Sequence, residues 1–273
     1  MIDQSSLKRF IINSNSYLFR QNKESKNALA YLVDDRKLNI DTINKFKIGY
    51  FPANYEIPEP IRYLNTYGAE DPNDYSYSIK NKIIVPILND TGCPLGFATR
   101  TPSADNYGKI KWWNTPFKKS ECLYGLFNSK RHIFKLNKVY IVEGQIDMIM
   151  LYQSKIKNVV AIMGTAFSEY HMGLILRYCD NICFGLDADS AGFNSLALSL
   201  KKIRDIKDIV KFSKISYMSF PDGLDPDEYV SINGKDSFYE LEKELNDDKI
   251  DEIIFNYEES KKQNILRKKQ LLE

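Results

Sequence analysis

Acidic side chains follow two of the apolar runs in the middle of the chain. Glu143 directly follows Val139–Val142, and Asp187 and Asp189 come after Ile182–Leu186. Residues i and i+2 of an extended segment project to the same side, so both aspartates can face one point. Close carboxylates repel one another unless a cation lies between them. A small set of hard oxygen ligands suits Mg²⁺ or Mn²⁺ bound together with phosphates.

Further carboxylates occupy comparable junctions. Asp147 falls in the first turn of the helix predicted after Glu143, where the helix dipole favours a negative charge. Asp225 and Asp227 lie in GLDPDE, and Asp225 before Pro226 has the pattern of an N-cap followed by proline at the first helical position. Capping explains any one of these acids alone. Three acidic clusters at corresponding ends of successive elements favour a site whose metal ions activate a hydroxyl and stabilise a leaving phosphate.

The elements that must position these acids are short strands alternating with helices. The runs Val139–Val142, Val159–Met163 and Ile182–Leu186 each have the length of a buried strand and each precede a helix-like segment. This alternation predicts a parallel sheet covered by helices, an α/β domain within a chain that is α+β overall. Acids after such strands lie at their carboxyl ends, where open α/β sheets bind ligands. Ile215–Phe220 predicts one more strand.

The flanking regions predict different structure. Residues 5–47 have a helical pattern in which Asp41 is placed to cap a short helix, and residues 48–78 contain four prolines, typical of irregular connections. Lys82–Leu88 and Leu95–Arg100 predict an antiparallel hairpin.

Three parts are expected along the chain. They are a basic N-terminal subdomain (1–136), the α/β domain (137–232) and C-terminal helices (233–273).

Positive charge is concentrated in the first of these parts. Residues 1–136 hold 20 Lys and Arg against 13 Asp and Glu, and Arg100–Leu136 holds eight against two. Aromatic residues are interleaved in this segment, among them Tyr107, Trp112, Trp113, Phe117 and Tyr124. Basic side chains neutralise phosphates and aromatic faces stack on bases, so this mixture suits a single-stranded nucleic acid. A solvated basic face beside an aromatic core explains the composition equally well.

The composition excludes several classes of protein. With 43% hydrophobic and 27% charged residues, the chain has an ordinary globular balance. No apolar run approaches the ~20 residues that span a bilayer, and the N-terminus lacks the apolar core of a signal peptide, so we expect a cytoplasmic protein. Four cysteines and two histidines show neither CxxC nor zinc-finger spacing, and no zinc is expected in this chain.

Four motifs resemble a known domain. EGQID, Gly164-Thr165, DADSAG and DPDE follow in the order and approximate spacing of the Toprim domain of bacterial DnaG-type primases. Toprim domains also occur in type IA and type II topoisomerases, recombination-mediator proteins and OLD-type nucleases. The flanking segments ALAYLVDDRKLNIDTINKFKIGY, IKNKIIVPILNDTGCPLGFATR and KWWNTPFKKSECLYGL are similar to primase segments in particular. The resemblance covers roughly residues 25–235.

The resemblance implies a DNA primase, a nucleotidyltransferase that makes short RNA primers from nucleoside triphosphates on single-stranded DNA. It implies that Glu143 is the central acid, a metal ligand and candidate general base, with Asp187 and Asp189 as the main Mg²⁺ ligands. The outer acids are Asp147, Asp225 and Asp227. The basic positions matched to template, nucleoside triphosphate or nascent RNA are Lys82, Arg100, Lys111 and Lys119. Asn114 and Tyr124 are expected to hold the local fold.

Full-length bacterial primases also carry an N-terminal zinc-binding module and a C-terminal helicase-interacting domain, for which this chain has no room. We therefore expect a polymerase core that works with a replicative helicase and a separate zinc-module or initiation partner, as in a phage replication system. Alternatives are a Toprim nuclease, in which the same acids direct water at a phosphodiester, a topoisomerase and a non-catalytic DNA-binding module. The primase-like flanks disfavour the nuclease, and the absence of a separate domain with an obvious nucleophilic tyrosine disfavours the topoisomerase. Retention of Glu143 and both DxD aspartates disfavours a pure binder.

Overall fold

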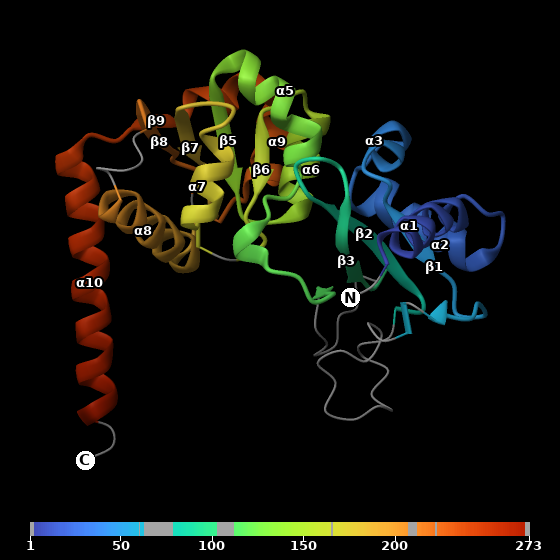
Figure 1. Ribbon diagram of the computed structural model, residues 1–273. Helices are drawn as coiled ribbons and strands as arrows, with labels where there is room; N and C mark the ends of the chain where they lie inside the picture. The colour runs from blue at the N-terminus through green and yellow to red at the C-terminus, as the bar shows by residue number, and fades with distance from the viewer. Residues whose placement is uncertain are drawn as a thin grey trace. The chain divides into compact units, whose positions relative to one another are not determined.

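The architecture is that of two compact units, Met1–Lys118 and Lys119–Glu273 (Figure 1). The computed structural model of the chain describes residues 3–59, 61–62, 79–102, 112–164, 166–206, 212–221 and 223–270, with side chains as far as residue 263. Among the helices in these ranges, none combines the length and hydropathy that a membrane span requires.

Helices and a small antiparallel sheet make up the first unit. Its elements are α1 (Gln4–Leu18), α2 (Lys23–Ala30), the π-helical turn η1 (Tyr31–Asp35), α3 (Ile40–Lys45), β1 (Gly49–Phe51), β2 (Lys82–Leu88), β3 (Pro94–Arg100) and β4 (Trp113–Asn114). The strand order is β1-β2-β3-β4, with every neighbouring pair antiparallel. The predicted hairpin is confirmed as β2 and β3. The stretch predicted as irregular contains β1, a three-residue strand that depends on pairing with β2.

Helix α1 covers one face of this sheet. Leu7, Phe10 and Ile11 are buried at spacings i, i+3 and i+4, which places them on one side of the helix. The ring of Phe10 lies 5.0 Å from that of Phe97 on β3, and Trp113 of β4 belongs to the same apolar cluster. Residues that alternate with Phe97 and Trp113 therefore point away from α1.

Polar side chains mark where helices of the first unit begin. Asp3 accepts a hydrogen bond from the backbone N–H of Ser6 (2.9 Å) at the start of α1. Asn39 accepts one from the backbone N–H of Thr42 (2.8 Å) and is the N-cap of α3, whereas Asp41 lies inside the first turn. The predicted cap was thus two residues late, because both side chains are of the capping type.

The second unit has an α/β arrangement, as predicted. Its elements are the 3₁₀ turn η3 (Lys119–Glu121), α5 (Leu126–Leu136), β5 (Lys138–Val142), α6 (Gln145–Gln153), β6 (Val159–Ala161), α7 (Glu169–Ile175), β7 (Asn181–Phe184), α8 (Ser190–Asp205), β8 (Lys214–Met218), α9 (Pro226–Glu240), β9 (Glu242–Glu244) and α10 (Asp247–Gln270). The strand order is β6-β5-β7-β8-β9, and only β9 is antiparallel to its neighbour among these described strands. The C-terminal region predicted as helices alone therefore also contains a strand.

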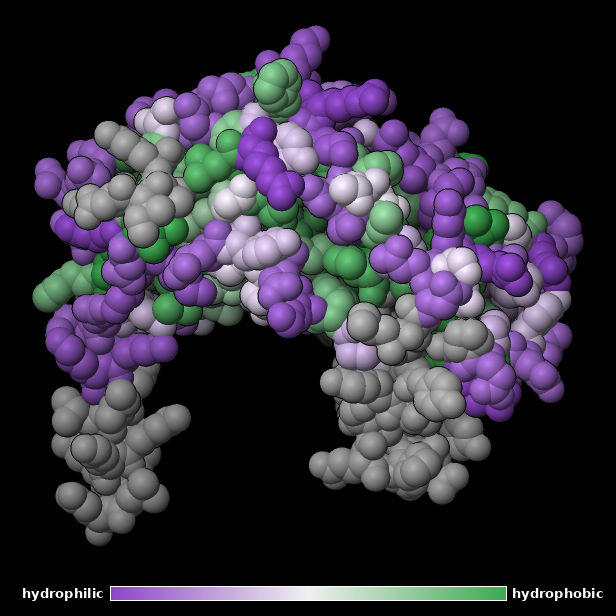
Figure 2. All heavy atoms as spheres, viewed as in Figure 1, coloured by the Kyte–Doolittle hydropathy of each residue, from purple (hydrophilic) through white to green (hydrophobic). Residues whose placement is uncertain are grey.

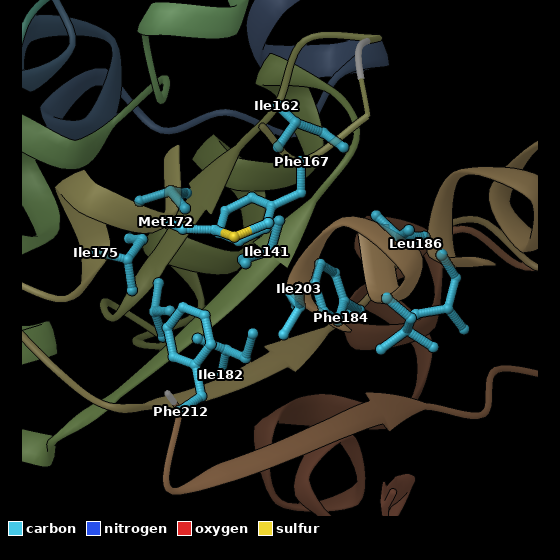
Figure 3. Packing of buried hydrophobic residues seen from close by; sticks show 14 of the residues in the cluster. Ile141, Ile162, Phe167, Met172, Ile175, Ile182, Phe184, Leu186, Ile203 and Phe212 are labelled. Carbon is cyan, nitrogen blue, oxygen red and sulfur yellow. The ribbon is translucent and has the colours of Figure 1, made fainter. Parts of the chain in front are cut away.

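Helices cover both faces of this sheet. Figure 3 shows Ile141, Ile182 and Phe184 of the strands packed with Met172 of α7 and Ile203 of α8, within one apolar cluster. On the other face Tyr140 packs against Phe238 of α9, with ring centres 5.2 Å apart. In the view of Figure 2 the most projecting side chains are largely hydrophilic, as expected when apolar residues fill such cores.

The boundary between the compact units falls at residues 118/119, upstream of the boundary expected at 136/137. Tyr124 forms an antiparallel bridge with Ala161, and Leu126 and Ile133 of α5 belong to the core of the second unit. Tyr124 thus lies at a structural position next to β6, in agreement with the role expected for it. The segment before β5 thus packs with the parallel sheet of the second unit.

Candidate active site

The predicted acids gather at the carboxyl edge of the parallel sheet. Ile141 of β5 pairs with Phe184 of β7 in parallel register, so both strands end at the same edge. Glu143 directly follows β5, and Asp187 lies three residues beyond β7. Asp225 is the N-cap of α9, the next helix after β8. Parallel pairing is thus what brings together acids that are about 40 residues apart in sequence.

Glu143 and Asp187 form the centre of this group. The backbone amide of Asp187 favours the charged form of the Glu143 carboxylate and so acts to lower the pKa of Glu143. Among the described residues, the buried oxygens Glu143 Oε1 and Asp187 Oδ1 have no hydrogen-bond partner. A buried carboxylate oxygen without a partner is costly, so both atoms would gain from a proton or a cation.

Burial and mutual repulsion disfavour negative charge at this centre. Burial raises the pKa of Glu143, and the negative charges of Asp189 and Asp225 raise it further. Burial, followed by the charge of Glu143, raises the pKa of Asp187 to about 7. The pKa of Asp147 is raised well above its ordinary value by burial and then by Asp227. These mutual effects place the predicted acids within one electrostatic cluster.

The outer acids also hold the local backbone. Asp147 Oδ2 accepts a hydrogen bond from the backbone N–H of Gly144 (2.9 Å) at the start of α6. Asp189 is the N-cap of α8, and its Oδ1 accepts from the backbone N–H of Gly192 (2.7 Å). Asp225 caps α9 by position, although its side chain makes no capping hydrogen bond. Capping and electrostatic clustering therefore coexist in these residues.

Glycine at position 192 is required by the geometry of the DxD loop. A Cβ atom built on Gly192 would lie 2.1 Å from the backbone carbonyl oxygen of Asp187. No real side chain fits at that separation without movement of the backbone. This close approach packs the start of α8 against the loop that carries Asp187.

The donor set fits a hard cation that is held jointly with phosphates. Within the described part of the chain, no group of three Asp, Glu, His or Cys side chains could hold a metal ion by itself. Glu143 and Asp187 nevertheless present the partnerless oxygens described above. Mg²⁺ commonly takes one or two protein carboxylates and completes its shell with water and substrate phosphate oxygens, which is the arrangement these residues can provide.

A cavity of about 260 Å³ lies beside these acids in the second unit. Asp187, Asp189 and Gly192 form part of its wall, and the remaining wall is mainly apolar. The cavity therefore continues the acidic edge of the sheet into a hydrophobic recess.

The predicted basic residues are distributed over different surfaces. Lys82 lies opposite Phe51 and, by strand alternation, on the α1 face of the first sheet, where its Nζ donates to Thr101 Oγ1 (2.6 Å). Arg100 points to the other face. Lys119 belongs to the second unit, in η3, where its carbonyl oxygen accepts a hydrogen bond from His171 Nε2 (2.9 Å). Lys111 lies outside the described residues.

Tyr31, a neighbour of Arg100, and Arg36, which contacts Tyr31, were missed in the sequence. The guanidinium carbon of Arg100 lies 5.9 Å from the ring centre of Tyr31 and 5.1 Å from that of Trp112. Arg36 donates from Nε to the hydroxyl of Tyr31 (2.9 Å). Tyr31 and Arg36 carry no sequence signal for this role, because only the π-helical turn brings them together.

Two protein-family models match the chain, one mainly over the first compact unit and one within the second. Residues 16–130 match the model of the DNA primase catalytic core, N-terminal domain, and residues 140–230 match a Toprim-like model. The chain is 32% identical over 242 residues to a DNA primase of Clostridium acetobutylicum, which covers 82% of this chain and 38% of the relative. It therefore spans well under half the length of that curated relative.

Solved structures give the same result. The structure of a DnaG catalytic core superposes with a TM-score of 0.76 at 25% identity, covering 93% of this chain and 82% of that one. A DnaG primase catalytic domain bound to single-stranded DNA superposes with a TM-score of 0.73 at 26% identity, covering 87% of this chain and 79% of that one. The matches extend across both units and include the primase-specific N-terminal part. The chain belongs to the DnaG-type primase family and corresponds to its catalytic core.

Proposed function

We propose that this chain is the RNA-polymerase core of a DNA primase and synthesises short RNA primers from nucleoside triphosphates on single-stranded DNA. The observation that carries the proposal is the pair of buried, partnerless carboxylate oxygens on Glu143 and Asp187, surrounded by further acids at the carboxyl edge of a parallel sheet. A protein that only bound DNA would gain nothing from concentrating negative charge beside phosphate.

The proposed reaction is nucleotidyl transfer. The 3′-hydroxyl oxygen of the growing strand forms a bond to the α-phosphorus of the incoming nucleotide, and the bond to the departing pyrophosphate breaks. Glu143 has a raised pKa because it is buried, and it is the side chain best suited to accept the hydroxyl proton. Mg²⁺ or Mn²⁺, when bound, would neutralise the phosphate charge. Asp187 and Asp189, together with Glu143, would hold that metal ion, with Asp147, Asp225 and Asp227 as outer acids.

The remaining assignments extend the same proposal. Arg100, Lys82, Lys111 and Lys119 would contact template, nucleoside triphosphate or nascent RNA, since cationic side chains neutralise phosphates. A replicative helicase and a separate zinc-module or initiation protein would supply the functions that full-length primases carry in other domains. Such an assembly would be a primosome in the cytoplasm of a bacterium or of a phage-infected cell.

The test is incorporation of labelled nucleotides by the purified chain on single-stranded DNA with Mg²⁺ or Mn²⁺. Glu143→Gln removes the proton acceptor while preserving side-chain volume, and we expect incorporation to fall by at least ~100-fold. Glu169→Gln is the matched control, because Glu169 is exposed on α7 and lies outside the acidic cluster.

Three outcomes separate the alternatives. RNA products from the parent chain and from Glu169→Gln, but not from Glu143→Gln, support the polymerase. Metal-dependent loss of DNA in the absence of nucleotides, abolished by Glu143→Gln, would replace it with a Toprim nuclease. Binding of DNA with neither reaction, even with a preformed primer, would contradict both enzymes.

A further inference from the structure

A buried histidine at the start of α7 uses both of its ring nitrogens. The imidazole of His171 is fully buried, with its centre 5.7 Å from the ring centre of Phe167. Its Nδ1 accepts a hydrogen bond from the backbone N–H of Ser168 (3.2 Å), and its Nε2 lies 2.9 Å from the carbonyl oxygen of Lys119. Because Nδ1 accepts, the network assigns the hydrogen of the neutral ring to Nε2, which donates to Lys119. Burial lowers the pKa of His171 and so favours this neutral form.

The Nδ1 bond completes the N-terminal cap of α7. Ser168 is the N-cap, and its Oγ accepts a hydrogen bond from the backbone N–H of His171 (3.1 Å) while Nδ1 returns one to the backbone N–H of Ser168. Glutamate or glutamine usually makes this reciprocal pair from the third helical position. A glutamate would complete the cap without any N–H to offer elsewhere. The donor on Nε2 is therefore an addition that capping does not require.

The Nε2 bond holds the 3₁₀ turn η3, which carries Lys119. The carbonyl oxygen of Lys119 also accepts from the backbone N–H of Cys122 (3.1 Å), so the imidazole takes the second lone pair of that oxygen. The hydroxyl of Ser168 donates to the next carbonyl oxygen, that of Ser120 (2.5 Å). Two consecutive carbonyl groups of η3 are thus held by side chains at the start of α7. They fix the backbone from which the half-buried Lys119 side chain extends.

η3 lies at the edge of the sheet where the acids gather. Tyr124 pairs antiparallel with Ala161, the last residue of β6, so the residues before Tyr124 run past the carboxyl end of that strand. Ala161 pairs with Val142 of β5 in parallel register, and the backbone N–H of Met163 donates to the carbonyl oxygen of Glu143 (2.8 Å). The start of α7, which holds η3, follows β6 on the same side. Lys119 therefore belongs to the acidic edge of the second unit.

We propose that His171 is a positioning residue for Lys119, and that it holds η3 so that the Lys119 ammonium group meets a phosphate at the acidic edge of the sheet. The lysine stem is long and flexible, and ordering it on binding costs free energy. An anchored backbone limits the positions that the ammonium group can reach. The proposal rests on the proposed function for the phosphate contact of Lys119. Nucleoside triphosphate, template strand and nascent RNA all present this phosphate chemistry.

Two substitutions of His171 separate the bond to Lys119 from the cap. His171→Asn carries an oxygen as far from Cβ as Nδ1, so it can accept from Ser168, but it has no group at the position of Nε2. His171→Gln is longer and carries an N–H that can reach the Lys119 carbonyl oxygen. Lys119→Met removes the ammonium group and keeps an unbranched side chain. The double variant of Lys119→Met and His171→Asn completes a cycle that measures the coupling of the two residues.

Binding of three labelled probes is measured by fluorescence anisotropy. The probes are a fluorescent GTP analogue with Mg²⁺, oligo(dT) and oligo(rU), and the probe whose Kd rises identifies triphosphate, template or transcript as the ligand. We expect Lys119→Met to raise that Kd by ~10- to 150-fold, the range for loss of one charged hydrogen bond. His171→Asn should raise it by about 5- to 10-fold, because a displaced ammonium group keeps its long-range attraction. His171→Gln should stay within about twofold of the parent chain, and His171→Asn should add less than about twofold to Lys119→Met.

A control and a spectroscopic measurement separate positioning from general destabilisation. Glu242→Gln removes a charge on β9, the edge strand opposite β6, and should lower the thermal midpoint without changing any Kd. The chain has two histidines, and His132→Gln leaves His171 as the single one. Nitrogen NMR of the labelled imidazole should show the hydrogen on Nε2. A hydrogen on Nδ1 would overturn the proposal, because Nε2 could not then donate to Lys119.

Three binding results would also overturn it. The first is a parental Kd in His171→Asn while Lys119→Met binds weakly, which would show that η3 keeps its position without the imidazole. The second is an effect of His171→Asn that persists at full size beside Lys119→Met, which would assign the loss to another contact. The third is a parental Kd in Lys119→Met for every probe, and nucleotide incorporation would then still support the polymerase. Absence of incorporation with intact coupling in the cycle would contradict the enzyme and leave the role of His171 in place.

Discussion

Glu143 and Asp187 follow the neighbouring strands β5 and β7, and the backbone amide of Asp187 favours the charged form of the Glu143 carboxylate and so lowers its pKa against the effect of burial. Glu143 Oε1 is nevertheless buried without a hydrogen-bond partner among the described residues. A buried carboxylate oxygen that is electrostatically unsatisfied is prepared for a cation or a proton. This preorganisation, rather than the number of acids, distinguishes the site from a set of helix caps.

The first prediction concerns metal binding. Mn²⁺ should stabilise the parent chain, because a cation that binds only the folded state adds about 2.7 kcal/mol at 100 times its Kd. Asp187→Asn should weaken this effect by removing one of the two partnerless carboxylates. Thermal unfolding over a Mn²⁺ series measures the change, with Glu169→Gln as control. Equal stabilisation of all three proteins would place the metal elsewhere.

The second prediction concerns pH in the presence of a chelator. The pKa of Asp187 is raised to about 7 in the folded chain, so the folded state holds this proton more tightly than the unfolded state does. The contribution of protonated Asp187 to the free energy of unfolding is therefore present at low pH and is lost as pH rises through about 7. Asp187→Asn should remove this loss and stabilise the chain at pH 8, on the order of 1 kcal/mol after allowance for solvent screening of the half-buried group. Urea unfolding at pH 6 and pH 8 measures the difference, and a variant less stable than the parent at pH 8 contradicts it.

The third prediction concerns the DxD loop. Gly192→Ala should displace the Asp187 loop, because the added Cβ would meet the Asp187 carbonyl oxygen at 2.1 Å. Metal binding and nucleotide incorporation should fall together. Gly173→Ala is the control, since a Cβ there meets nothing within 4 Å inside α7 and alanine favours a helix by roughly 0.5–1 kcal/mol. Normal Mn²⁺ affinity in Gly192→Ala would show that the loop adapts.

Much of the α/β unit was predictable because its signals are local. Each run of buried residues is followed by a helix, and the acids after β5 and β7 occupy positions that any parallel sheet brings to one edge. The caps also gave clear signals, as Asp225 before Pro226 illustrates. The order of the strands in the sheet could not be derived in the same way. In the structure β5 lies between β6 and β7, so that β6 forms an edge of the sheet, and tertiary packing decides this order.

The remaining features depend on contacts distant in sequence. The short strands β1 and β9 carry too few residues for a period-two pattern and exist by pairing with β2 and β8. The sequence assigned Lys82 and Arg100 to one set of nucleic-acid-binding or nucleotide-binding residues, but the pleat of the sheet turns them to opposite faces. The π-helical turn that joins Tyr31 to Arg36 has no composition of its own. Such features require the register and the packing to be known.

The last prediction concerns Glu242, which holds β9 to the parallel sheet. Its carboxylate pairs with Lys138 Nζ and accepts from Ser216 Oγ (2.6 Å). Burial alone raises the pKa of Glu242, but the hydrogen bonds from Lys138 and Ser216 outweigh burial and lower it. Glu242→Gln should destabilise the chain at pH 7 by about 1–3 kcal/mol, because Lys138 loses its counter-charge in a partly buried position.

The pH dependence of that difference tests its cause. A lowered folded-state pKa gives stability that is present above the ordinary glutamate value and is lost as pH falls through the folded value. Urea unfolding of parent and Glu242→Gln should therefore differ at pH 7 and converge in acid. Glu259→Gln, which breaks the exposed pair with Lys262 on α10, should leave the unfolding free energy unchanged at both values. A difference that persists undiminished in acid would assign the effect of Glu242→Gln to packing rather than to charge.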